Sequence, residues 1–368
     1  MKNISFPLLL LTLVLLLPSC RQREYSLVKT DNPAYRPNTI FISYEDLRSP
    51  RFEHLRRKYR LDTVFHGEKD EFKRILLLRH WIKTVIPINN DSEHYSGDGY
   101  AEGILDAALK GEGFHCGHFM VVQNAVMNAY GYVTRCLGAG PGVKGGPDGH
   151  HGINEIWLNK YHKWFLSDAK YDHHFEKNGI PLSALEIRDE YLKNKAADIV
   201  LVRGPARKVI ERSPDTGRDK ESNAQTYTWI EWHKYNNRFT VWPDFQTGLI
   251  MYEDDYFRNH TWYWGGKPHW AYNTPYMTLV KEREKIEWTP NTIASKVLLN
   301  GPEMTIILTS DTPNLKEYQQ KEMPDGSWHR VADTLVMVLK KKNYEWAFRT
   351  VNLAGVAGPV HRVSVTSQ

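Results

Sequence analysis

The stretch from Gly113 to Asp168 constrains the fold more than any other part of the chain. Its candidate nucleophile is Cys116, which lies just before an apolar run with helical spacing. The spacing predicts that the thiol sits at a helix N-terminus. There the helix dipole and the unpaired N–H groups favour the thiolate, which is the nucleophilic form of cysteine.

Two further residues of this stretch fit the same chemistry. His151 begins a strand-like run, and Asp168 ends a second short strand that a tight turn joins to the first. Antiparallel pairing of the two strands would carry Asp168 next to His151. An imidazole beside the sulfur can take its proton and return it to a leaving group, while a carboxylate fixes the ring's tautomer. The order of cysteine, histidine and aspartate along the chain therefore predicts a triad of Cys116, His151 and Asp168.

Around these residues the chain resembles the transglutaminase-like superfamily, a branch of the papain-like cysteine enzymes. The resemblance covers roughly residues 70–185 and rests on Gly-x-x-Cys-Gly-x-Phe, Ala-Tyr-Gly-Tyr-Val-Thr-Arg, His-x-x-x-Glu and Trp-x-x-x-Asp. It implies an α+β core in which Cys116 is the nucleophile, His151 the general base and acid, and Asp168 the orienting carboxylate. Members often carry an acid two residues after the cysteine, where this chain has His118.

Alternative roles for the same residues remain. His150 competes with His151 as the base, although the spacing to Glu155 favours His151. Cys136 fits a small buried residue better than a nucleophile. Metal ligands could come from histidines of this region, but none has a spacing that supports a zinc site. These histidines are His115, His118, His150, His151, His173 and His174. We expect neither metal nor cofactor, and His173 is a candidate to line the substrate cleft.

The first residues predict a targeting signal rather than part of the folded protein. Residues 1–19 contain Lys2 and a short apolar run, which is typical of a signal peptide. The run ends at Cys20, in a context that resembles a bacterial lipobox, so we expect lipidation of Cys20. A plain signal peptide with an incidental cysteine is the alternative. The resemblance implies a cell-envelope protein that is lipid-anchored to a membrane, facing the periplasm or the outer surface, with residues 20–39 as a polar tether.

The 368 residues suggest two or three domains. We expect a catalytic core at 40–196, an aromatic-rich β extension at 197–290, and a β-sandwich at 291–368. The last segment resembles fibronectin type III or immunoglobulin-like modules. The chain is therefore expected to be α+β, with strands increasing toward its C-terminus.

The middle segment is notable for aromatic residues, since six of the chain's twelve tryptophans lie there. They are Trp229, Trp232, Trp242, Trp262, Trp264 and Trp270. Exposed rings can stack on sugars or grip peptides, and we take Trp262 and Trp264 as candidates for substrate contact. Packing of these rings in the core of a sheet is the favoured alternative for the set.

Charge and cysteine content narrow the function. The formal net charge is +5, or +4 without Lys2, and no basic stripe indicates a nucleic-acid partner. Three cysteines form no disulfide framework.

From the resemblances to the transglutaminase-like superfamily and to a lipobox, we expect an exported lipoprotein that acts on amide bonds of peptides, glycopeptides or cell-wall peptides through a thioester, with hydrolysis favoured over amine transfer. The alternative is a non-catalytic glycan- or protein-binding lipoprotein that uses the same fold as a scaffold.

Overall fold

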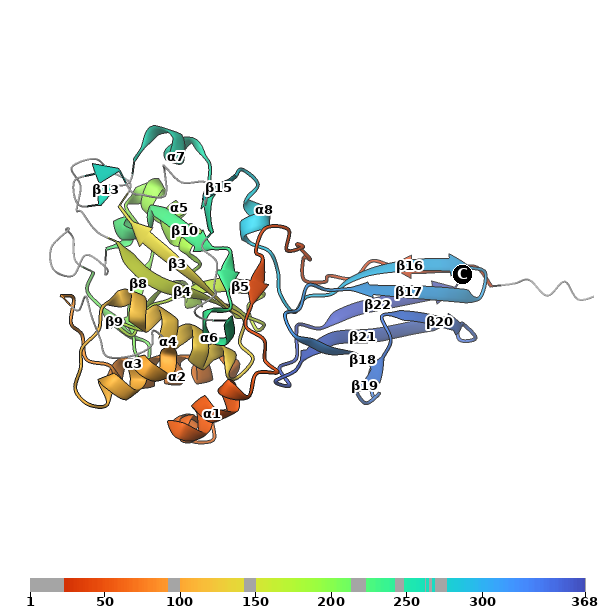
Figure 1. Cartoon of the computed structure of the whole chain (residues 1–368). Helices are drawn as coiled ribbons and strands as arrows, with labels where there is room; N and C mark the ends of the chain where they lie inside the picture. The colour runs from red at the N-terminus through yellow and green to blue at the C-terminus, as the bar shows by residue number, and fades with distance from the viewer. Residues whose placement is uncertain are drawn as a thin grey trace, which may run out of the picture.

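The computed structural model describes residues 23–91, 100–141, 150–212, 223–241, 248–261, 263–264, 267–268 and 277–367. It is a mixed α and β structure in which strands predominate among the described residues. Figure 1 shows a body that contains the helices and, at one side of it, an elongated unit built of strands. Within the described ranges, no helix is both long enough and apolar enough to cross a membrane.

Helices form the first part of the body. They are α1 (Pro50–Lys58), the 3-10 helix η1 (Leu61–Phe65), α2 (Glu71–Val85), α3 (Ala101–Ala108) and α4 (Cys116–Asn128). The start of α2 is fixed by Asp70, whose carboxylate accepts a hydrogen bond from the backbone N–H of Lys73 at 3.0 Å. Pro87 lies just beyond its end. Apolar side chains of α1 to α4 share one buried cluster.

One six-stranded sheet, in the order β15-β12-β10-β3-β4-β5, supports these helices. Its strands are β3 (Thr134–Gly140), β4 (His151–Leu158), β5 (Lys163–Ser167), β10 (Trp229–His233), β12 (Leu249–Tyr252) and β15 (Met277–Val280). Only β12 and β15 run parallel to each other. The sheet runs across the domain boundary that we expected at residue 197, because β10 pairs directly with β3.

Alternate side chains of the sheet enter two separate cores. Ile156 of β4 and Phe165 of β5 pack with α2 and α4. Trp157 and Trp164 point into the other core, which α5 and a second sheet cover. The elements on this side are β6 (His173–Lys177), β7 (Ile180–Pro181), β8 (Val200–Arg203), β9 (Lys208–Ile210) and α5 (Ala184–Asn194). The start of α5 is set by a capping box between Ser183 and Glu186.

Short elements connect the edges of the body. They are β2 (Ser43–Tyr44), η3 (Ala224–Tyr227), β11 (Tyr235–Asn236), α6 (Arg238–Val241), α7 (Asp255–Asn259), β13 (Tyr263–Trp264), β14 (Lys267–Pro268) and α8 (Arg283–Ile286). Glu45 joins several of them, because its carboxylate accepts from the backbone N–H groups of Phe239 and Thr240 and from Asn124 of α4. Burial raises the pKa of Glu45 to about 7, although these hydrogen bonds oppose the shift.

Two sheets form the elongated unit, in the orders β1-β22-β21-β18-β19 and β16-β17-β20. The strands are β1 (Tyr25–Val28), β16 (Ala294–Asn300), β17 (Glu303–Thr309), β18 (Leu315–Glu322), β19 (His329–Val331), β20 (Thr334–Val338), β21 (Asn343–Asn352) and β22 (His361–Ser367). Both sheets contribute to one apolar core, as Ile306 of β17 and Phe348 of β21 illustrate. Figure 1 shows the strands extending away from the body.

The N-terminal segment differs from our expectation of a free tether over residues 20–39. Tyr25–Val28 forms β1, which pairs antiparallel with β22 along its whole length. Farther along, Tyr35 donates a hydrogen bond to Asp311 at 2.8 Å. Pairing with β22 satisfies backbone groups of this segment that a tether would leave to water. The described part of the segment therefore belongs to the strand unit.

Polar contacts join the strand unit to the body. The side-chain amide of Asn352 donates to the carbonyl of Gly131 at 2.8 Å, just after α4 ends. Asn314 donates to the backbone carbonyl of Glu45 and accepts from the N–H of Leu47. The unit thus contacts the C-terminal end of α4, which is about 20 Å from the start of that helix at 1.5 Å per residue.

The described tryptophans of the middle segment pack in the interior. Trp229 and Trp232 are 2% and 0% exposed, which agrees with the core role that we favoured for the set. Trp242, Trp262 and Trp270 lie outside the described residues. The side chain of Trp264 is not described either, so the structure gives no information on the two rings that we expected to contact substrate.

Candidate active site

Cys116 is the first residue of α4, and its side chain is half-buried. His115 caps the helix, since its Nδ1 accepts a hydrogen bond from the backbone N–H of Gly117 at 3.1 Å. Phe119, Val122 and Val126 anchor the helix in the core, which fixes where its first turn lies. The thiol is therefore held at the positive end of a helix, where a thiolate is stabilised.

A glycine brings the strand that carries the histidines against this helix. Gly152 of β4 faces the first turn of α4, and a Cβ there would lie 3.2 Å from the Cα of Gly117. Any larger residue would force the strand and the helix apart. The absent side chain thus allows His150 and His151, which precede Gly152, to lie beside the sulfur of Cys116.

His151 and Asp168 form a buried pair. The register of β4 and β5 places Asn154 opposite Ser167, and Asp168 follows directly. His151 Nε2 lies 2.7 Å from Asp168 Oδ2, and each side chain is 1% exposed. The other carboxylate oxygen accepts from the backbone N–H of Tyr171 at 3.1 Å. This arrangement leaves Nδ1 as the ring nitrogen of His151 that can act on the thiol.

The charges of this pair reinforce each other. Burial alone would lower the pKa of His151, but the Asp168 carboxylate and the Cys116 sulfur raise it to about 10. Burial alone would raise the pKa of Asp168, but His151 and His173 hold it well below its usual range. At neutral pH the pair is an imidazolium beside a carboxylate.

The same surroundings lower the pKa of the Cys116 thiol to about 2. Burial opposes this shift, but hydrogen bonds from His115, His150 and His151 outweigh it. The other described cysteine behaves in the opposite way, because burial raises the pKa of Cys136 to about 12. The surroundings therefore favour the thiolate form at Cys116 and the neutral thiol at Cys136.

A second histidine–carboxylate pair lies at the same sulfur. His150 Nε2 is 3.2 Å from Glu231 Oε1 of β10, and the Cys116 thiol lies 3.9 Å from the backbone carbonyl of His150. Burial would lower the pKa of His150, but Cys116 and Glu231 raise it to about 9. We did not predict Glu231 as a site residue, because the sequence gives no sign that its strand pairs with β3.

His173, which we placed in the substrate cleft, lies behind the pair instead. It is 1% exposed, and its Nε2 is 3.2 Å from Asp168 Oδ2. The reason is that the backbones of Asp168 and His173 form a β-bridge, which turns the ring inward. His174 is also buried, between Arg79 and Glu176, and burial lowers its pKa to about 4. His173 therefore lies against Asp168, and His174 belongs to the neighbouring buried contacts of Arg79 and Glu176.

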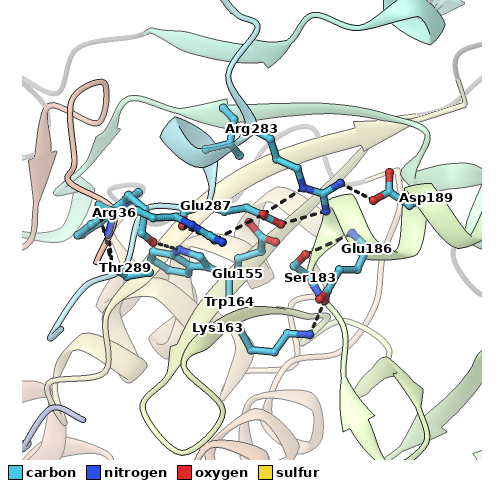
Figure 2. Close-up of polar contacts among 12 residues, drawn as sticks. Arg36, Glu155, Lys163, Trp164, Ser183, Glu186, Asp189, Arg283, Glu287 and Thr289 are labelled. Atoms are coloured by element: carbon cyan, nitrogen blue, oxygen red, sulfur yellow. Dashed lines mark hydrogen bonds and ion pairs between the residues drawn. The ribbon is translucent and has the colours of Figure 1, made fainter. Parts of the chain in front are cut away.

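Glu155 anchors the strand that carries His151. Its carboxylate accepts hydrogen bonds from Arg135 Nε and Nη2, from Trp232 Nε1 and from the backbone N–H of Ala184. Arg135 also donates to the carbonyl of Ile286 in α8, and Figure 2 shows the polar contacts of Arg283, from the same helix, with Asp189 and Glu287. The glutamate of the His-x-x-x-Glu pattern is therefore a buried support on the side of the sheet that α5 covers, opposite α2 and α4.

Metal binding has no preformed site in the described part of the chain. There, no group of three or more His, Cys, Asp or Glu side chains is arranged to hold a metal ion. The histidines nearest the thiol are instead engaged with carboxylates or with the start of α4, as described above.

Comparison with known proteins adds little to this geometry. No family model matches the chain, and no curated protein matches it. Among solved structures it is similar to a chain described as a "Putative Cysteine Protease from Cytophaga hutchinsonii", with 15% sequence identity and a TM-score of 0.26. The match covers 44% of this chain and 50% of that chain.

Proposed function

We propose that this chain is a cysteine enzyme of transglutaminase-like type, with a papain-like core, that acts on amide bonds of peptides or glycopeptides. The observation that carries the proposal is the half-buried thiol at the start of α4, next to the His151–Asp168 pair. A structural cysteine has no use for a lowered pKa, whereas a nucleophile depends on it. Cys116 is accordingly the proposed nucleophile, and Asp168 orients His151.

The reaction follows from the charges. The Cys116 thiolate attacks the acyl carbon, and the carbonyl π pair moves to oxygen as the C–S bond forms. The His151 imidazolium then gives its proton to the leaving nitrogen as the C–N bond breaks, which leaves a thioester. Neutral His151 next removes a proton from water or an amine, which attacks the thioester and regenerates the thiolate. Asp168 keeps its charge and stabilises the imidazolium throughout.

Water is the more abundant acceptor, so hydrolysis is the favoured outcome, and amine transfer is the competing one. We keep peptides, glycopeptides and cell-wall peptides as the proposed substrate class. Contact of Trp262 and Trp264 with such a substrate also remains a proposal, which rests on the sequence alone.

Turnover of p-nitrophenyl acetate tests the triad, because its acyl group can form the same thioester. Wild type should release a burst of p-nitrophenolate. Asp168→Asn should slow the burst, since the ring of His151 then loses its tautomer and its charge and no longer stabilises the Cys116 thiolate. Asp198→Asn is the matched control, because Asp198 bonds only to Lys193 and Asn194 at the surface. A burst of equal rate in Asp168→Asn and wild type would refute the triad.

We also propose that the protein is exported and lipid-anchored through Cys20, and that its two C-terminal sheets form an immunoglobulin- or fibronectin type III-like module. In support, the first described strand, β1, belongs to the strand unit, where Tyr25 pairs with Ser367. An anchor a few residues before β1 would make this unit a spacer between membrane and body. Labelling with a fatty acid should mark wild type but not Cys20→Ser. Equal labelling of the two proteins would contradict the anchor.

A further inference from the structure

His150 lies beside the reacting sulfur but has no role in the proton transfers described above. Its backbone carbonyl is 3.9 Å from the Cys116 sulfur, and its ring is close enough to lower the pKa of the thiol. The ring also meets Glu231 Oε1 at 3.2 Å. The site thus holds two histidine–carboxylate pairs at one thiol, of which acid–base catalysis uses only the pair of His151 and Asp168.

The sheet is built to admit the second pair. Glu231 of β10 lies opposite Gly138 of β3, which in turn lies opposite Gly152 of β4. A Cβ at Gly138 would come within 2.5 Å of Glu231 Oε1 and 2.6 Å of His150 Nε2. The backbone of Gly138 is not in the left-handed region, so its conformation does not require glycine. A side chain at Gly138 would therefore occupy the space that the His150–Glu231 pair needs.

The groups around His150 keep it charged. Cys116 of α4 and Glu231 of β10, both anionic, outweigh burial and raise the pKa of His150 to about 9. His233 of β10 also interacts electrostatically with His150, and burial, Arg238 and His150 hold the pKa of His233 well below its usual range. The pKa of about 9 makes His150 a cation at neutral pH, and His115 and His151 hydrogen-bond to the same Cys116 sulfur.

We propose that His150 is a further catalytic residue, whose imidazolium donates a hydrogen bond to the oxyanion that forms when Cys116 attacks an acyl carbon. The inference rests on the function proposed above. As the C–S bond forms, the carbonyl π pair becomes a third lone pair on oxygen, and the N–H of His150 stabilises that charge. His150 keeps its proton, while His151 supplies the proton to the leaving group. Glu231 is a positioning residue that orients the ring and holds it cationic.

Two electrophiles separate this role from simple support of the thiolate. Acylation by p-nitrophenyl acetate passes through an oxyanion, whereas alkylation by iodoacetamide does not, and both require the thiolate. His150→Phe, which keeps a ring of similar size but has no N–H donor, should lower acylation by about 100-fold, as the loss of one oxyanion donor does elsewhere. It should change alkylation far less when both rates are compared at their pH-independent maxima. His80→Gln is the control, because it breaks another histidine–carboxylate pair, with Asp172, without touching the thiol.

The pH profile tests the role of Glu231. The p-nitrophenolate leaving group needs no proton from His151, so the acylation rate of wild type should fall as pH rises through the pKa of His150, about 9. Glu231→Gln should move this fall to lower pH, because the anion that favours the imidazolium is gone. The alkylation profile should stay flat over the same range. This variant also keeps the test available if His150→Phe does not fold.

Each remaining outcome overturns the inference. Equal losses of acylation and alkylation in His150→Phe would show that the residue only keeps the thiolate charged. An acylation rate equal to wild type, or an unchanged pH profile in Glu231→Gln, would show that the pair is not used. If wild type itself gives no acylation that depends on Cys116, the proposed function fails as well, which distinguishes the two failures.

Discussion

Glu155 offers the sharpest test of how the fold holds the site, through the substitution Glu155→Gln. The carboxylate is fully buried and accepts four hydrogen bonds, of which three go to Oε2. The fourth joins Oε1 to the backbone N–H of Ala184. A glutamine has one acceptor oxygen. If that oxygen faces Arg135 and Trp232, its amide N–H₂ group faces the N–H of Ala184, and two donors then oppose each other.

The expected loss follows from the uncompensated charge. The Arg135 side chain is 1% exposed, so removing its carboxylate leaves a buried guanidinium without an anion. Breaking a buried pair in this way costs about 3–5 kcal/mol. Arg135 retains its hydrogen bond to the carbonyl of Ile286 and its contact with the ring of Trp164. Because these contacts remain, we expect a loss near the lower end of this range, at about 3 kcal/mol.

Urea unfolding followed by tryptophan fluorescence measures this loss. The control is Glu322→Gln, which removes the partner of Lys341 in a pair whose side chains are 66% and 52% exposed. The control should change the free energy of unfolding by no more than about 0.5 kcal/mol. A loss in Glu155→Gln as small as that of the control would refute the account of Glu155 as the anchor of β4.

Three other outcomes are expected. Iodoacetamide should alkylate Cys116 at a rate that is flat across neutral pH, because its thiol pKa of about 2 keeps it ionised, while Cys136, with a thiol pKa of about 12, should react only on unfolding; equal rates would count against the ion pair. A protein of residues 33–290, which lacks both sheets of the strand unit, should fold and retain the reactive thiol, and aggregation alone would show one shared core. Trp229→Ala should lower stability by about 3–5 kcal/mol, and an unchanged melting temperature would contradict its burial.

The sequence allowed the site to be predicted where its geometry is local. Helical spacing after Cys116 is sufficient to place a thiol at a helix start. The turn after β4 joins two neighbouring strands, and their antiparallel register brings His151 and Asp168 within 2.7 Å. Both features depend on residues close in the chain, and patterns of apolar and turn residues report such features.

Distant pairings could not be predicted in the same way. Glu231 reaches His150 only because β10 pairs with β3, and Tyr25 pairs with Ser367 near the other end of the chain. Neighbours in sequence usually pair in a sheet, so no local pattern signals these partners. His173 shows a third limit, since its inward orientation depends on the bridge to Asp168 rather than on its own residue type.

Peptide mapping after brief exposure to p-nitrophenyl acetate and an acid quench tests the central claim most directly, because it locates the acyl group. The account predicts one acetyl group on Cys116 in wild type, formed before lysines react, and none at residue 116 in Cys116→Ala. His151→Gln should still carry a thiol but should acylate and release the acetyl group much more slowly. Absence of the adduct from wild-type Cys116, or its appearance at the same rate in His151→Gln, would contradict a thioester mechanism at this site.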